Sequence, residues 1–84
     1  MNKTALESSF NDLISSLSSN QTAESYYRKV RDKLVAMDDR NELKLFLDAI
    51  CGSAKAKDVY GLSLEQCAAW DKMWDEANRL RATM

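Results

Sequence analysis

The chain contains no histidine and no proline, and it has only two glycines in 84 residues. Without histidine it lacks the usual general base of Ser-His and Cys-His nucleophile pairs and the commonest transition-metal ligand. Without proline the strongest helix breaker is missing, so long helices are allowed almost everywhere. These absences exclude most enzyme classes and favour a helical fold.

The chain also has no long hydrophobic run, and no apolar segment follows its N-terminal residues. We therefore expect neither a membrane span nor a signal peptide. Two cysteines, Cys51 and Cys67, are too few for the disulfide framework of a small secreted domain. We expect two reduced, buried thiols and a cytoplasmic location, and the alternatives are a disulfide between them or a reactive thiol.

Length and composition indicate one small globular domain. Hydrophobic residues make up 45% of the chain, charged residues 30%, and the formal net charge is −1. We expect residues 1–84 to form a single helical domain, because a chain of this length supports one modest core and no deep cavity. The near-neutral charge argues against a non-specific nucleic-acid binder and against a strongly acidic DNA mimic.

Four segments place apolar residues at the spacing of an amphipathic helix. We expect helices over about 5–17, 22–37, 40–51 and 64–82, and no segment shows sustained strand-like alternation. Four helices with short links predict an all-α fold, a small antiparallel helical bundle of about four helices. The stripes of the first two helices are Leu6, Phe10, Leu13, Ile14 and Leu17, and then Ala23, Tyr27, Val30, Leu34 and Met37.

Short polar motifs predict where these helices begin and end. A Thr, Asp or Ser followed three residues later by Glu or Gln predicts a capping box, and Thr22 alone predicts the N-cap of the second helix. We expect Gly52 to take left-handed φ and close the third helix. We interpret 53–61 as a loop with one helical turn. The predicted capping boxes are Thr4 with Glu7, Asp39 with Glu42, and Ser63 with Gln66.

The third segment is the most apolar, so we expect its helix at the centre of the fold. The short link at Asp38 and Asp39 predicts that the second and third helices are direct neighbours, and the fourth helix is expected to be the longest. The apolar face of the third helix is formed by Leu43, Phe46, Leu47 and Ile50, and is widened by Leu45 and Cys51.

The last helix carries the strongest candidate for a binding surface. Its tryptophans are four residues apart and therefore lie on one helix face, where they are either core residues or contacts to a partner. The apolar stripe continues to the end of the chain, past the length that three shorter helices easily cover, which favours a partner. The predicted partner interface is Trp70, Met73, Trp74, Ala77, Leu80 and Met84.

A second candidate surface is the basic cluster in the second helix. It contains Arg28, Lys29, Arg31 and Lys33. Such a cluster is either a solvated helix face, a phosphate-contacting patch, or a dock for an acidic partner. Four cations contact only a few phosphates, which predicts weak and salt-sensitive nucleic-acid binding.

The carboxylates do not predict a metal site or a catalytic pair. One group follows a helix end and is explained by capping and the helix dipole, and the other lies beside cations on the last helix. No phosphate-binding glycine motif is present, so we expect no metal and no cofactor. The two groups are Asp38, Asp39 and Glu42, and Asp71, Asp75 and Glu76.

The sequence therefore favours a small non-enzymatic protein–protein interaction module: an adaptor, an inhibitor or a regulatory subunit, from a host or from a phage or other mobile element. It is expected to act through the amphipathic C-terminal helix and to self-associate as a homodimer through that helix. The alternative is a nucleic-acid-binding regulator that uses the basic second helix. An enzyme remains only through the thiols of Cys51 or Cys67 or through unpaired carboxylates.

Overall fold

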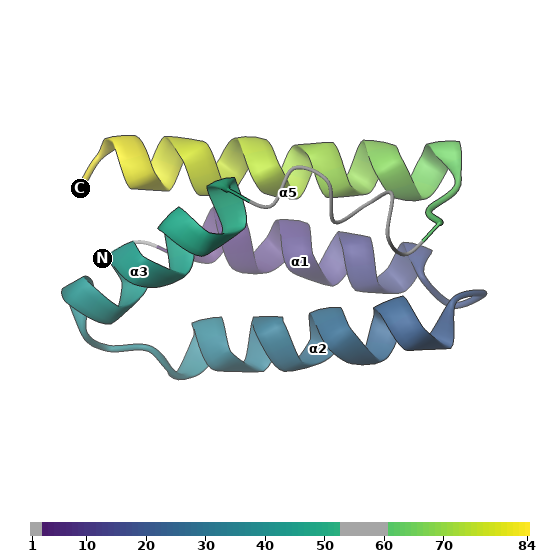
Figure 1. Cartoon of the computed structure of the whole chain (residues 1–84), viewed down its shortest axis with the longest axis horizontal. Coiled ribbons are helices and arrows are strands. Elements are labelled where there is room, and N and C mark those ends of the chain that lie inside the picture. Colours follow the sequence, from purple (N-terminus) through teal and green to yellow (C-terminus); the bar gives the residue numbers. More distant parts are fainter. Residues whose placement is uncertain (1–2, 53–60) are drawn as a thin grey trace.

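The computed structural model describes residues 3–52 and 61–84, and in this part of the chain the regular structure is entirely helical. Helix α1 runs antiparallel to both α2 and α5, while the shorter α3 lies obliquely across one end of the bundle (Figure 1). The predicted all-α helical bundle is confirmed. The helices are α1 (Thr4–Ser16), α2 (Gln21–Ala36), α3 (Arg40–Cys51) and α5 (Leu64–Ala82).

Helices α1 and α5 are the two inner elements of the fold. Helix α1 packs against both α2 and α5, whereas α3 packs mainly against α5. The prediction that the third helix is central is therefore wrong, and so is its pairing with the second helix, because α3 diverges from α2 after the link (Figure 1). The prediction that the last helix is the longest is confirmed, since α5 has 19 residues.

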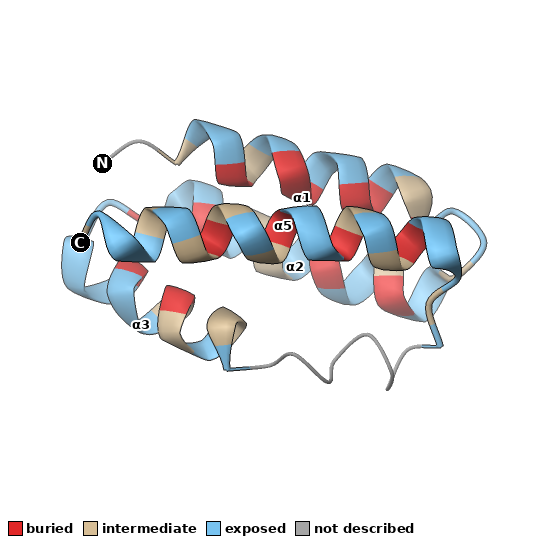
Figure 2. Cartoon of the chain, turned by 90° about the horizontal axis from the view of Figure 1, so that it is seen from above, coloured by how far each residue is buried: buried red, intermediate tan, exposed pale blue. Residues whose placement is uncertain are grey.

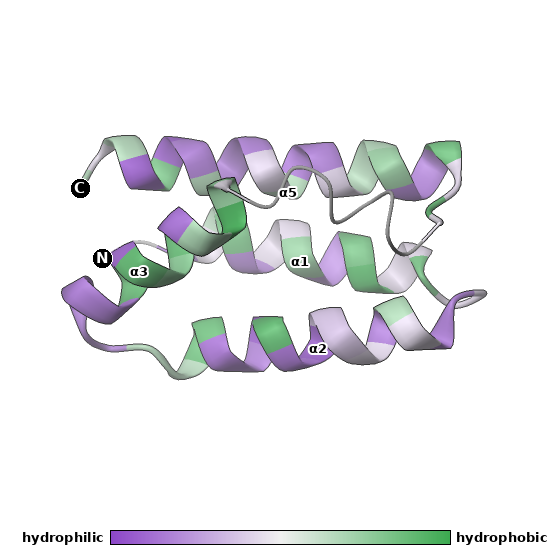
Figure 3. Cartoon of the chain, in the orientation of Figure 1, coloured by the Kyte–Doolittle hydropathy of each residue, from purple (hydrophilic) through white to green (hydrophobic). Residues whose placement is uncertain are grey.

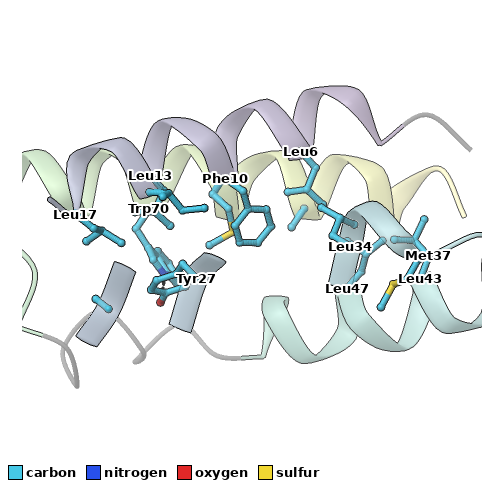
Figure 4. Packing of buried hydrophobic residues seen from close by; sticks show 14 residues of the cluster. Leu6, Phe10, Leu13, Leu17, Tyr27, Leu34, Met37, Leu43, Leu47 and Trp70 are labelled. Carbon is cyan, nitrogen blue, oxygen red and sulfur yellow. Dashed lines mark hydrogen bonds between the residues drawn. The ribbon is translucent and has the colours of Figure 1, made fainter. Parts of the chain in front are cut away.

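The reason for this arrangement is visible in the burial of each helix. The apolar stripe of α1 is fully buried, and α2 and α5 both pack against this helix. Helix α3 carries hydrophobic and hydrophilic residues (Figure 3), and much of it is exposed (Figure 2). A high content of hydrophobic residues therefore does not make a helix central. The buried set of the core, shown in part in Figure 4, is Leu6, Phe10, Leu13, Ile14, Leu17, Ala23, Tyr27, Leu34, Met37, Leu43, Leu47, Trp70, Met73 and Ala77.

Two of the predicted helix starts are confirmed. The Asp39 carboxylate accepts hydrogen bonds from the N–H groups of Asn41 (2.7 Å) and Glu42 (3.4 Å) at the start of α3. At the start of α5 the Ser63 hydroxyl accepts from the Gln66 N–H, and the Gln66 side chain accepts from the Ser63 N–H, which completes the capping box. Each cap satisfies backbone donors that the first helical turn leaves free.

The other two predicted starts are wrong by one or two residues. Helix α1 begins at Thr4 with Lys3 as its N-cap and without a side-chain cap, so no capping box forms at Thr4. Helix α2 is capped by Asn20, whose side chain accepts from the Ala23 N–H at 3.2 Å, and not by Thr22. Asparagine is at least as good an N-cap as threonine, and Asn20 precedes Thr22, so α2 begins earlier than predicted.

The predicted left-handed conformation of Gly52 is wrong. Gly52 has φ −82° and does not take the left-handed conformation, whereas Gly61 has φ +62°. Nothing lies within 4 Å of a Cβ built at Gly61, so the backbone conformation alone favours glycine there. The rest of the predicted loop, 53–60, lies outside the described residues.

Two polar side chains join elements across the bundle. The buried Gln66 amide donates to the carbonyl of Ser16 at 2.9 Å and to the hydroxyl of Ser19 at 3.3 Å, which ties the start of α5 to the end of α1. At the other end, the Lys3 ammonium donates to the carbonyls of Leu34 (2.7 Å) and Met37 (2.5 Å). A cation there also compensates the negative end of the α2 dipole.

Both cysteines are free thiols and are half-buried, whereas the sequence predicts full burial. Among the described residues, no helix combines the length and the apolar character that crossing a bilayer requires.

We predict that Lys3→Met lowers the free energy of unfolding by about 1–2 kcal/mol, because charge-assisted hydrogen bonds to the end of α2 are lost. Urea denaturation followed by circular dichroism measures this change. The same substitution at the exposed Lys29 is the control and should stay within about 0.5 kcal/mol of the wild type. Equal effects at the two positions would show that Lys3 does not anchor α2.

Candidate functional site

The predicted partner interface on the last helix is largely core. Trp70, Met73 and Ala77 are 2%, 0% and 0% exposed, so the folded chain does not offer them to a partner. The remaining three, Trp74, Leu80 and Met84, are partly buried and pack against the same core. The tryptophan face of α5 therefore points into the bundle.

The end of α5 is also covered within the chain. Arg81 forms an ion pair with Asp48 of α3 (Nε to Oδ1, 2.8 Å), and the Arg40 guanidinium donates to the Met84 carbonyl at 3.1 Å. The stripe does not overhang the bundle as expected from the sequence, because α3 packs across this end.

Both indoles find hydrogen-bond partners inside the fold. Trp70 Nε1 donates to the Tyr27 hydroxyl at 2.9 Å, between side chains that are each 2% exposed (Figure 4). Trp74 Nε1 donates to the carbonyl of Cys51 at 3.3 Å, and the two indole rings stack with centroids 6.4 Å apart. The pair thus joins α5 to α2 and to the end of α3.

The basic cluster of the second helix does not form one surface. Arg28 pairs with Glu24 at 2.9 Å. Arg31 pairs with Asp32 at 3.0 Å and donates to the Asn11 side chain of α1 at 3.1 Å.

The two lysines of the cluster lie on another side of α2. Lys33 lines a groove beside α3, so it faces away from the α1 side that Arg31 contacts. Lys29 is exposed and one turn before Lys33, so it shares that flank. A phosphate-binding patch of four converging cations therefore does not form, which removes the main support for nucleic-acid binding.

An open and largely apolar groove lies between α2 and α3, and we call it the α2–α3 groove. Its volume is about 410 Å³. Leu45 stands in it with 70% of its surface exposed, although it is a large aliphatic residue. The groove is lined by Lys33 and Met37 on one side, and by Glu42, Leu45, Phe46 and Ala49 on the other.

The spacing of α3 explains why Leu45 is exposed. Leu43 and Leu47 are one turn apart and both buried, whereas Leu45 lies two residues from each and so points to the other side. Glu42, Leu45 and Ala49 form a second stripe at spacings of three and four. The expectation that Leu45 widens the core face is therefore wrong, and this spacing is the signal that separates it from the core.

A smaller depression of about 260 Å³ lies between the start of α1 and the end of α5. Its walls include Ala5 and Leu80, and an ion pair between Glu76 and Arg79 (3.2 Å) stands beside them. Since both charges are already paired and the depression is smaller, the α2–α3 groove is the better candidate site.

Within residues 3–52 and 61–84, no three His, Cys, Asp or Glu side chains come close enough to hold a metal ion. Of the predicted carboxylate groups, Asp39 is a helix cap and Glu76 pairs with Arg79. In the same part of the chain, every buried side-chain nitrogen and oxygen has a hydrogen-bond partner.

Comparison of the chain with protein-family models, with curated proteins and with solved structures found no match. The functional argument therefore rests on the geometry of the described residues.

We predict that Tyr27→Phe lowers the free energy of unfolding by about 1–3 kcal/mol, because the buried Trp70 N–H loses its acceptor. Urea denaturation followed by tryptophan fluorescence is the measurement. The control is Tyr26→Phe, the same change at the neighbouring residue, which is 45% exposed and should have an effect below about 0.5 kcal/mol. If Tyr27→Phe is as mild as the control, the hydrogen bond does not contribute to stability.

Proposed function

We propose that this chain is a small non-enzymatic protein–protein interaction module, an adaptor, inhibitor or regulatory subunit, that binds its partner through the α2–α3 groove. The observation that carries the proposal is the exposure of Leu45 in a concave apolar surface. Removing apolar surface from water favours association by about 25 cal/mol per Å², from which the entropic cost of association is subtracted. Concave apolar surfaces with few charges are where partner side chains anchor.

The lining of the groove supports binding and not catalysis. Its two ionisable side chains, Lys33 and Glu42, stand on opposite helices around an apolar floor. The chain has no histidine to activate a hydroxyl or a thiol. Free thiols at Cys51 and Cys67 fit a reducing compartment, so the proposal includes a cytoplasmic location.

The proposal moves the binding surface from α5 to α3. The α5 face remains relevant only where Trp74, Leu80 and Met84 reach the surface. Nucleic-acid binding is the alternative function, and the experiment must distinguish it from protein binding. The ion pairs of Arg28 and Arg31 weaken the case for nucleic-acid binding.

We predict that a photo-activatable benzophenone side chain at position 45 cross-links to one specific protein, which includes a second copy of this chain, in cells of the source organism. The matched control carries the same group at Val35, which is 54% exposed but is two residues from both Lys33 and Met37 and so lies off the groove. The position-45 adduct should persist after nuclease treatment, and mass spectrometry identifies it.

Equal adducts from both positions, or none from position 45, would overturn the groove as the binding surface. An adduct with nucleic acid in place of protein would transfer the function to the alternative. Both cross-linking variants should unfold at the wild-type temperature, because neither native side chain belongs to the core.

A further inference from the structure

We infer that the occupant of the α2–α3 groove is a second copy of this chain, packed about a two-fold axis with α3 against α3. The inference rests on the proposed function, because it names the partner of the same groove. It is carried by two kinds of self-complementarity in the groove, one of shape and one of charge.

Large and small side chains alternate on the groove side of α3. Leu45 lines the groove with most of its surface exposed, and Ala49, one turn further on, is the smallest side chain in the lining. A two-fold axis between these positions packs antiparallel α3 helices so that each Leu45 lies over the Ala49 of the other copy. Because α3 spans Arg40–Cys51, this axis falls near the middle of the helix, and the segment from Leu43 to Cys51 lies alongside the same segment of the other copy.

The two sides of the groove carry opposite charges. Lys33 stands on α2 and Glu42 on α3, and neither side chain is in an ion pair within the part of the chain that the structure describes. An isologous interface places the same patch on both copies, so a patch with one cation and one anion on opposite sides pairs with itself twice. A patch of one sign would repel its own copy.

The interface is expected to be small. Stable interfaces bury about 1,200–2,000 Å² in total, and a 12-residue helix beside one groove offers only a limited surface for such a contact. We therefore expect a reversible dimer with a dissociation constant on the order of 1–100 µM. The dimer interface is α3, in contrast to the α5 dimer that the sequence suggested.

We predict that sedimentation velocity on the intact chain shows a monomer–dimer equilibrium in this range of concentration. Lys33→Glu and Glu42→Lys should each weaken dimerisation about tenfold or more, since each variant sets like charges against each other at two places. An equimolar mixture of the two variants should restore the dimer, because both cross-pairs are then attractive. This rescue also shows that both variants are folded.

Leu45→Lys should abolish the dimer, and Val35→Lys is its matched control and should leave the dimer unchanged. A chain that stays monomeric at the highest concentration, a mixture without rescue, or a dimer that is insensitive to Leu45→Lys would each overturn the inference. If the chain is monomeric but position 45 still cross-links a different protein, the second copy is excluded and the proposed function stands. If position 45 cross-links nothing, both fail.

Discussion

The structure depends on the burial of one apolar stripe, that of α1. All of the large apolar residues from Leu6 to Leu17 are inside the core, and α1 packs against both α2 and α5. Full burial of one such side chain is worth about 1.5–3 kcal/mol, so this stripe is a major source of stability. It also commits the apolar faces of α2 and α5, including the tryptophan face, to the inside of the molecule. Helix α3 is then left to cover only one end.

The polar interactions act at the ends of this arrangement and fix how the helices align. Lys3 binds the end of α2, while Gln66 joins the start of α5 to the end of α1. Between them, the hydrogen bond from Trp70 to Tyr27 crosses the core from α5 to α2. Each joins residues that are more than 30 positions apart in sequence. They therefore select one alignment of the three long helices among those that apolar packing alone allows.

These long-range partners mark the limit of what the sequence predicts. The helix bounds, the α1 and α2 stripes and the caps at Asp39 and Ser63 depend on residues within one or two turns, and the sequence predicts them well. The central helix, the direction of the tryptophan face and the division of the basic cluster depend on which helices pack together, so the sequence mispredicts them or leaves them open. Gly52 shows the same limit on a smaller scale, because its position directly after α3 predicts a left-handed φ and its φ is −82°.

The candidate site is distinguished from the rest of the surface by its exposed apolar residue, Leu45. Single exposed apolar residues are normal on small domains, and Leu64 and Val35, which stand apart from the grooves, need no functional explanation. Leu45 differs because its neighbours in space are also apolar and the surface is concave, with Phe46 and Ala49 beside it on α3 and Met37 opposite. The bundle reaches full burial of α1 without this surface, so its stability does not require a leucine at position 45. Leu45 is an aliphatic side chain that contributes little to the fold, and α3 holds it in an open apolar groove. An intermolecular contact explains this position better than the folding of a single chain does.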